Sequence, residues 1–215
     1  MAYSFTTNTG IPVEMHSEEQ MYTPELVFGH LYTSSNFNDD GDDREETGGR
    51  HGLGAKLANI FSPHFRVECL DNQRRKLFRM EWERNMHTRH VPVVTDVSPR
   101  RGTRARDYTE IVFRPDLQRF GMTCLDKDTV ALLTKRVYDI AGCNPTVRVF
   151  LNKRPIRLQG GFEAYVGLYL NRRRRAGPPV PRVFRQIDER WSVCVALSES
   201  GHEFQQVSFV NSVCT

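Results

Sequence analysis

The residues of this chain best suited to chemistry are four glycines and a lysine that stand directly before an apolar run. Gly48 is followed by Gly49, Gly52, Gly54 and Lys56. Glycine permits positive φ and lets the backbone approach an anion closely, and the first amides of a following helix have no partners within it. The segment therefore predicts a phosphate-binding loop made of Gly49, Arg50, His51, Gly52, Leu53, Gly54, Ala55 and Lys56.

The spacing of this loop differs from two better known phosphate loops. A Walker A loop has glycine directly before its lysine and a hydroxyl residue after it, whereas Ala55 precedes Lys56 and Leu57 follows it. The dinucleotide fingerprint fails too, because Leu57 stands where its third glycine is needed. About a dozen residues upstream lie Ser34, Ser35 and Asn36. Their two hydroxyls and one amide can also bind phosphate or ribose oxygens.

Several further stretches extend this pattern in a fixed order over about residues 10–215. They are residues 11–14, 21–29, 33–36, 47–62, 125–133, 137–142, 189–191 and 207–212. Together they closely resemble the ATPase region of eukaryotic DNA topoisomerase II. The resemblance implies an α+β fold of the GHKL (Bergerat) type, a mixed and mostly antiparallel sheet covered by helices, followed by the first strands of a transducer domain.

The same resemblance divides the chain and assigns a ligand to the loop. It implies a divergent N-terminus at residues 1–9, an ATPase domain at 10–185 that is incomplete at its N-terminal side, and the truncated start of a transducer at 186–215. ATP would lie against the loop, with the amides of Gly52, Leu53 and Gly54 and the charge of Lys56 on its phosphates. Ser34, Ser35 and Asn36 would contact ribose and phosphate. Whether Arg50 binds ATP or forms a structural ion pair stays open.

The family's activity supplies the expected partners. In the complete enzyme, by resemblance, ATP with Mg²⁺ closes a homodimeric gate that captures double-stranded DNA for strand passage in the nucleus. An alternative stays open, in which the domain has become a nucleotide-independent DNA-binding or interaction module.

Two departures from the family bear on activity. Residues 1–9 do not match the segment that carries the family's water-activating glutamate and magnesium-binding asparagine, so no catalytic residue and no metal ligand can be assigned. The DNA-cleavage domain would lie beyond Thr215, and we expect these 215 residues alone neither to cleave DNA nor to hydrolyse ATP at a useful rate. His51 stands where the family generally has asparagine, and is either tolerated or makes ATP affinity depend on pH.

Composition and charge agree with a globular chain that has uneven basic blocks. The net charge is +4, and no apolar run approaches the roughly 20 residues of a membrane span, so we expect no membrane partner. Five scattered cysteines indicate reduced thiols that mostly fill the core. Residues 39–46 are acidic and predict a solvated loop. Residues 84–106, with six arginines and one acid, and Arg172 to Arg175 indicate exposed loops, a DNA-facing surface or, for the second block, a nuclear import signal.

Hydrophobic periodicity predicts the elements that hold the loop. Helices are expected at residues 24–31, 53–61 and 126–140, the last with Gly142 just past its end. Alternating apolar and polar residues predict strands at 65–69, 78–82, 108–113 and 146–151, with a turn at Asn152 and Lys153. Residues 191–197 and 206–210 are expected to form a hairpin joined through residues 199–201.

Overall fold

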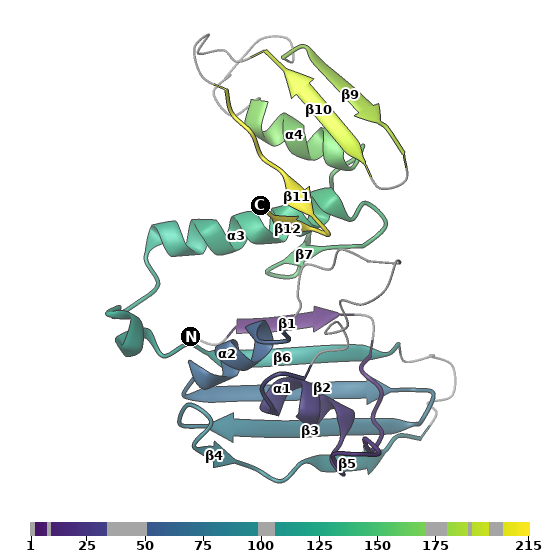
Figure 1. Cartoon of the computed structure of the whole chain (residues 1–215), viewed down its shortest axis with the longest axis vertical. Coiled ribbons are helices and arrows are strands. Elements are labelled where there is room, and N and C mark those ends of the chain that lie inside the picture. Colours follow the sequence, from purple (N-terminus) through teal and green to yellow (C-terminus); the bar gives the residue numbers. More distant parts are fainter. Residues whose placement is uncertain are drawn as a thin grey trace. The chain divides into compact units, whose positions relative to one another are not determined.

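The computed structural model describes residues 3–7, 10–33, 51–98, 106–170, 180–188, 191–197 and 204–215, with the backbone alone for residues 3–7. The chain divides into two compact units, of which the first ends at Cys124 and the second begins at Leu125 (Figure 1). The expected boundary at residues 185 and 186 lies inside the second unit. The division into residues 1–9, 10–185 and 186–215 therefore stays a prediction.

The first unit is built on a six-stranded sheet whose described pairs are all antiparallel. The strand order is β1-β6-β2-β3-β4, and β5 also pairs with β3 (Figure 1). The strands predicted at residues 65–69, 78–82 and 108–113 are confirmed. Their bounds, with those of the shorter strands, are β1 (Tyr3–Thr7), β2 (His64–Asp71), β3 (Lys76–Glu83), β4 (Thr88–Arg89), β5 (Val93–Asp96) and β6 (Tyr108–Arg114).

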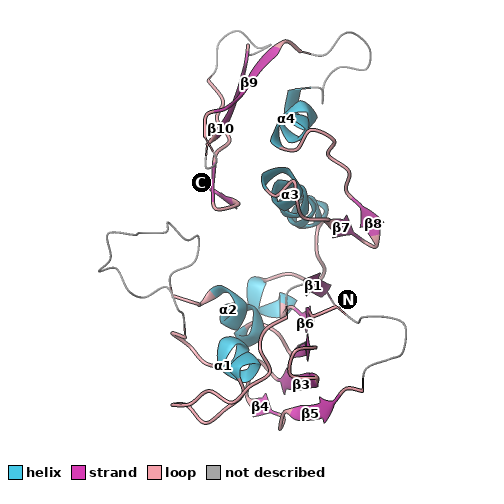
Figure 2. Ribbon diagram, turned by 90° about the vertical axis from the view of Figure 1, so that its right-hand side faces the viewer, coloured by secondary structure: helices cyan, strands magenta, loops and turns pink. Residues whose placement is uncertain are grey.

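Two short helices, α1 (Thr23–Gly29) and α2 (Gly54–Ile60), cover one face of this sheet (Figure 2). Alternation sends every second side chain of the central strands toward them, which is why these strands could be predicted. α1 ends at Gly29, which packs closely against the core. A Cβ added at this position would lie 3.0 Å from Cζ2 of Trp82. The buried core consists of Val13, Phe28, Phe65, Val67, Cys69, Phe78, Met80 and Trp82.

The opposite face of the sheet carries paired charges. Arg66 and Glu110 form an ion pair at 3.1 Å between β2 and β6. Glu68 accepts from Arg79 on β3 and from the Tyr108 hydroxyl, which lies 2.6 Å from it. Cross-strand pairs of opposite charge stabilise a sheet modestly. These pairs place positive and negative groups side by side on this face.

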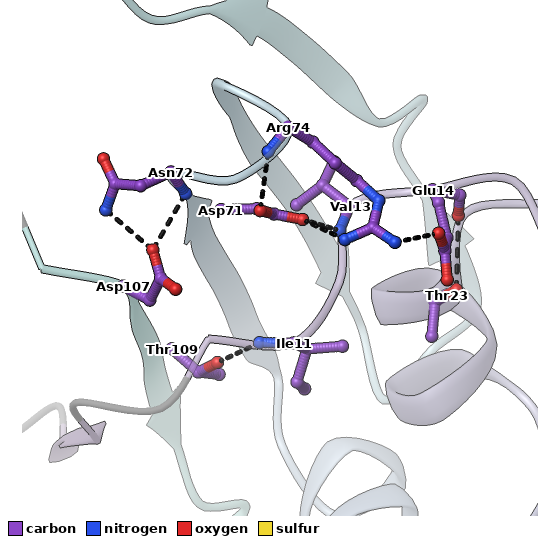
Figure 3. Close-up of polar contacts among 9 residues, drawn as sticks. All are labelled: Ile11, Val13, Glu14, Thr23, Asp71, Asn72, Arg74, Asp107 and Thr109. Carbon is purple, nitrogen blue, oxygen red and sulfur yellow. Dashed lines mark hydrogen bonds and ion pairs between the residues drawn. The ribbon is translucent and has the colours of Figure 1, made fainter. Parts of the chain in front are cut away.

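A buried carboxylate joins the segment after Gly10 to the turn between β2 and β3 through hydrogen bonds (Figure 3). Asp71 accepts the Val13 amide at 3.0 Å and the Arg74 amide at 2.9 Å, and it also pairs with the Arg74 guanidinium. Arg74 reaches on to Glu14, whose carbonyl accepts the amide of Thr23 at the start of α1 at 2.9 Å. Burial raises the pKa of Asp71, but these donors outweigh it and the pKa lies below its ordinary value.

Replacing Asp71 with Asn should destabilise the first unit by about 1–3 kcal/mol near neutral pH, because the Val13 and Arg74 groups lose a charged acceptor. A depressed folded-state pKa gives stability that is complete above the unfolded pKa of about 4 and is lost as pH falls through the folded value. The deficit should therefore shrink in acid. Urea unfolding followed by the fluorescence of buried Trp82 measures it.

The matched control is Asp96→Asn. Its side chain is 91% exposed and lies 3.6 Å from Lys76, so its loss should cost under about 0.5 kcal/mol. Equal effects of the two substitutions would contradict the structural role of Asp71.

The second unit packs two helices side by side, α3 (Lys127–Cys143) and α4 (Phe162–Leu170). Asp126 caps α3 by accepting the Thr129 amide at 2.7 Å, so the predicted start is confirmed. Asp139 is 2% exposed and accepts from the Tyr165 hydroxyl at 2.6 Å and from Lys135 at 2.9 Å. Arg136 also pairs with it at 3.2 Å, so three donors, two from α3 and one from α4, stabilise the buried carboxylate.

Three predictions for the second unit are wrong. Gly142 lies inside α3, where it is needed because a Cβ would fall 2.5 Å from Cγ of Tyr165. Residues 146–149 form no strand, although the turn at Asn152 and Lys153 is confirmed by their positive φ.

The third wrong prediction concerns strand pairing, since residues 191–197 pair with residues 182–186, not with 206–210. The strands are β7 (Phe150–Leu151), β8 (Arg154–Pro155), β9 (Arg182–Gln186), β10 (Ser192–Ala196), β11 (Phe209–Val210) and β12 (Val213–Cys214), in pairs β7–β8, β9–β10 and β11–β12.

Smaller differences concern the helix ends and the cysteines. α1 ends at Gly29 rather than at residue 31, and a 3-10 helix at Leu117–Phe120 follows β6. None of the five cysteines forms a disulfide, but only Cys69 is buried, so the prediction that they mostly fill the core is wrong. Burial raises the pKa of the Cys69 thiol to about 11.

Gly142→Ala should weaken the packing of α3 on α4 and lower the free energy of unfolding of the second unit by about 1–3 kcal/mol. The reason is that the Tyr165 ring is 2% exposed and has no free space to move into. Faster hydrogen exchange in α3 and α4, with unchanged exchange in β2 and β3, is the expected result. Unchanged exchange in α3 would contradict the close packing of the two helices.

Candidate nucleotide site

The structure describes part of the predicted phosphate site. Ser34, Ser35, Asn36, Gly49 and Arg50 lie outside the described residues. Those described are His51, Gly52, Leu53, Gly54, Ala55 and Lys56, which run into the first turn of α2.

The described part of the loop has the backbone that its glycines predict. Gly52 has φ +60, a conformation that costs other residues energy. Leu53 then stands at the N-cap of α2, and its carbonyl accepts the amide of Leu57 at 2.8 Å. His51 and Gly54 are exposed. The loop therefore turns at Gly52 and enters the helix directly, as expected.

Lys56 is the charged member of the loop, and its side chain is buried. The residue is 2% exposed, and its Nζ donates to Oγ1 of Thr33 at 2.6 Å and to the carbonyl oxygen of Thr33 at 3.1 Å. Desolvation by burial lowers the pKa of the Lys56 ammonium. A buried ammonium is tolerated when it is hydrogen-bonded, and Thr33 supplies the acceptors.

Sequence reasoning missed Thr33 as a member of the site. Its hydroxyl lies 3.2 Å from the carbonyl oxygens of both Leu26 and His30, at the end of α1. The sequence signal was its position directly before Ser34 within a matching stretch, but nothing local indicates that a residue 23 positions before Lys56 accepts from it.

A second contact joins the two helices beneath the loop. Asn59 is fully buried, and its Nδ2 donates to the carbonyl of Phe28 at 3.2 Å. Its Oδ1 has no protein partner among the described atoms. Asn59 thus joins α2 to α1, and Lys56 joins α2 to Thr33, which follows α1.

The one cavity characterised in the described residues lies elsewhere on the first unit. It has a volume of about 400 Å³, and its lining includes Met15, Tyr22, Glu25 and Arg89 but none of the predicted site residues. Glu25 is 3% exposed and pairs with Arg89. Because the cavity lacks the lysine and the glycines, we do not assign the phosphate site to it.

The described residues also contain no cluster of three or more histidine, cysteine, aspartate or glutamate side chains that could hold a metal ion. None of the helices described is both long and apolar enough to cross a lipid bilayer.

Comparisons with known proteins place this geometry in context. No family model matches the chain. The probable DNA topoisomerase 2 of Dictyostelium discoideum is 47% identical over 207 residues, which are 96% of this chain and 13% of that protein. DNA topoisomerase 2 of Arabidopsis thaliana is 46% identical over 212 residues, 97% of this chain and 14% of its own.

Solved structures agree with these relatives. The ATPase region of Saccharomyces cerevisiae topoisomerase II superposes with a TM-score of 0.86 at 40% identity, over 99% of this chain and 53% of that one. The ATPase and transducer domains of DNA topoisomerase II from Balamuthia mandrillaris give a TM-score of 0.87 at 41% identity, over 99% and 51%.

The antiparallel sheet, its covering helices and the glycine loop give the first unit an α+β fold of the GHKL class. Sequence and fold together show that the chain is a homologue of the ATPase region of eukaryotic DNA topoisomerase II, so the predicted family and fold class are confirmed. The chain spans about one seventh of the length of the curated relatives it matches.

Gly52→Ala should destabilise the first unit by about 1–2 kcal/mol, because a Cβ at φ +60 is strained and would lie 2.5 Å from the Thr33 carbonyl oxygen and 2.9 Å from Nζ of Lys56. Gly54→Ala is the control, since a Cβ there meets nothing within 4 Å. It should be neutral or slightly stabilising in a helix. Urea unfolding read by Trp82 fluorescence compares them, and equal effects would contradict the loop geometry.

Proposed function

We propose that this chain is the ATP-binding region of an ATP-hydrolysing type II DNA topoisomerase. The observation that carries the proposal is the superposition of 99% of the chain on a solved topoisomerase II ATPase region at 40% identity. The loop from Gly49 to Lys56 binds the triphosphate, and Ser34, Ser35 and Asn36 contact ribose and phosphate.

Lys56 supplies the positive charge of this site. An ammonium has three N–H donors. Among the described residues Thr33 accepts two of them, and we assign the third to a phosphate oxygen. At an effective dielectric constant of about 20, a charge pair about 4 Å apart interacts by about 4 kcal/mol before desolvation. Losing this charge should therefore weaken binding strongly.

The partners of the whole protein follow from the same proposal. ATP binding closes a nuclear homodimer around double-stranded DNA, and the nucleotide acts through its greater affinity for the closed state. Of the basic residues 84–106, Arg84 donates to Thr88 at 2.9 Å and Arg89 pairs with buried Glu25, so both serve the fold. We assign DNA contact to the remaining arginines. Those that lie outside the described residues are Arg100, Arg101, Arg104 and Arg172 to Arg175.

Mg²⁺ accompanies ATP in this proposal, but the described residues provide no set of ligands for it, and we derive no step through the ion. We also assign no catalytic base. Binding of nucleotide, rather than turnover, is therefore the activity that these residues support.

Lys56→Met should lower the affinity for a non-hydrolysable ATP analogue by at least about tenfold, which corresponds to about 1.4 kcal/mol. Isothermal titration calorimetry on the whole chain measures it. Lys76→Met is the control, because Lys76 is a half-exposed lysine of the same unit that pairs with exposed Asp96, and it should leave affinity unchanged.

The second candidate function is a nucleotide-independent DNA-binding or interaction module. It is favoured by one observation, the burial of the Lys56 ammonium against Thr33 rather than at the surface. Undetectable binding of the analogue by both wild type and Lys56→Met would support this module and overturn the nucleotide proposal.

A further inference from the structure

Thr33 offers two acceptors to one ammonium. Its hydroxyl oxygen and its carbonyl oxygen lie 2.6 Å and 3.1 Å from Nζ of Lys56. A two-point contact fixes the direction of an ammonium better than one bond does, because a lysine side chain otherwise rotates freely about its long stem.

Two neighbouring carbonyls determine that the Thr33 hydroxyl acts as an acceptor toward Lys56. A hydroxyl has one proton and two lone pairs. The carbonyls of Leu26 and His30, each 3.2 Å away, can only accept, so the proton points to one of them. A lone pair is then available for the ammonium, and the bond to Lys56 has a defined polarity.

The chain reaches this arrangement through a strained backbone. Tyr32 has φ +58, an uncommon conformation for a residue with a side chain. It reverses the chain after α1, so that Thr33 returns to the carbonyls at the end of that helix. On the other side, Gly52 leaves room for the Thr33 carbonyl, since a Cβ would stand 2.5 Å from it. Strain of this kind persists only where neighbouring contacts hold it.

The helix that precedes Thr33, α1, is itself held at its N-terminal end. Thr23 donates both its amide and its hydroxyl to the Glu14 carbonyl, at 2.9 Å and 3.2 Å, and Glu14 pairs with Arg74 (Figure 3). Buried Asn59 holds the middle of the interface through the Phe28 carbonyl. These contacts hold α1, from which the chain turns to Thr33.

We propose that Thr33 is a positioning residue for the polyphosphate of the bound nucleotide: its two oxygens accept two N–H groups of the Lys56 ammonium and direct the third toward a phosphate oxygen. The inference rests on the proposed function. It predicts that the Thr33 hydroxyl affects nucleotide affinity without touching the nucleotide.

The test compares Thr33→Val, which keeps the shape and removes the hydroxyl, with Thr33→Ser, which keeps the hydroxyl. Affinity for the ATP analogue, measured calorimetrically on the whole chain, should fall about tenfold in the valine variant and return to within about threefold of wild type in the serine variant. Thr95→Val is the matched control, because it makes the same change at an exposed threonine of β5 that is not a partner of Lys56, and its affinity should stay that of wild type.

A second readout needs no nucleotide. NMR titration of the Lys56 side chain should show that Thr33→Val lowers the pKa of its ammonium below the wild-type value, while Thr33→Ser and Thr95→Val leave it unchanged. A merely structural role for Thr33 would not move this titration selectively.

Two outcomes would overturn the inference. One is wild-type affinity in Thr33→Val, and the other is a Lys56 titration that the valine substitution does not change. Failure of the proposed function looks different, because wild type itself would then bind no analogue. In that case the positioning of Lys56 is decided by the NMR titration alone.

Discussion

Burial of one ammonium group is the constraint on which the candidate site depends. The ammonium of a lysine that is 2% exposed must be hydrogen-bonded, because an unpaired buried charge costs several kcal/mol. Lys56 meets this requirement only if the chain after α1 returns to it. The contact with Thr33 therefore ties the glycine loop to a segment 23 residues earlier. That contact is made possible by the turn at Tyr32, by the absence of a side chain at Gly52 and by the packing of α1 on α2.

The same solution appears twice more, with carboxylates in place of the ammonium. Asp71 fastens the segment after Gly10 to the sheet of the first unit, using two backbone amides and a guanidinium. Asp139 joins α3 to α4 in the second unit through Tyr165 and Lys135. Each of the two buried carboxylates accepts from donors in separate segments, and partnered charges of this kind favour one arrangement of those segments over others.

Much of the first unit could be predicted because its signals are local. Phe65 and Val67, like Phe78 and Met80, alternate with charged residues, and one covered sheet face requires that pattern. The second unit was harder. Gly142 resembles a helix terminator in sequence, and only the Tyr165 ring on another helix shows why glycine is needed inside α3. Strand partners such as β9 and β10 were missed because short exposed strands carry little periodicity.

The sequence by itself determined the family, the glycine loop and the lysine that follows it, since glycine's backbone freedom and a lysine's charge belong to the residues themselves. The tertiary structure alone decided that Lys56 is buried, that Thr33 is its partner and that Asp71 and Asp139 are neutralised by particular donors. The physical reason is that a hydrogen bond acts over about 3 Å, and which distant residues come that close is fixed only when the whole core packs.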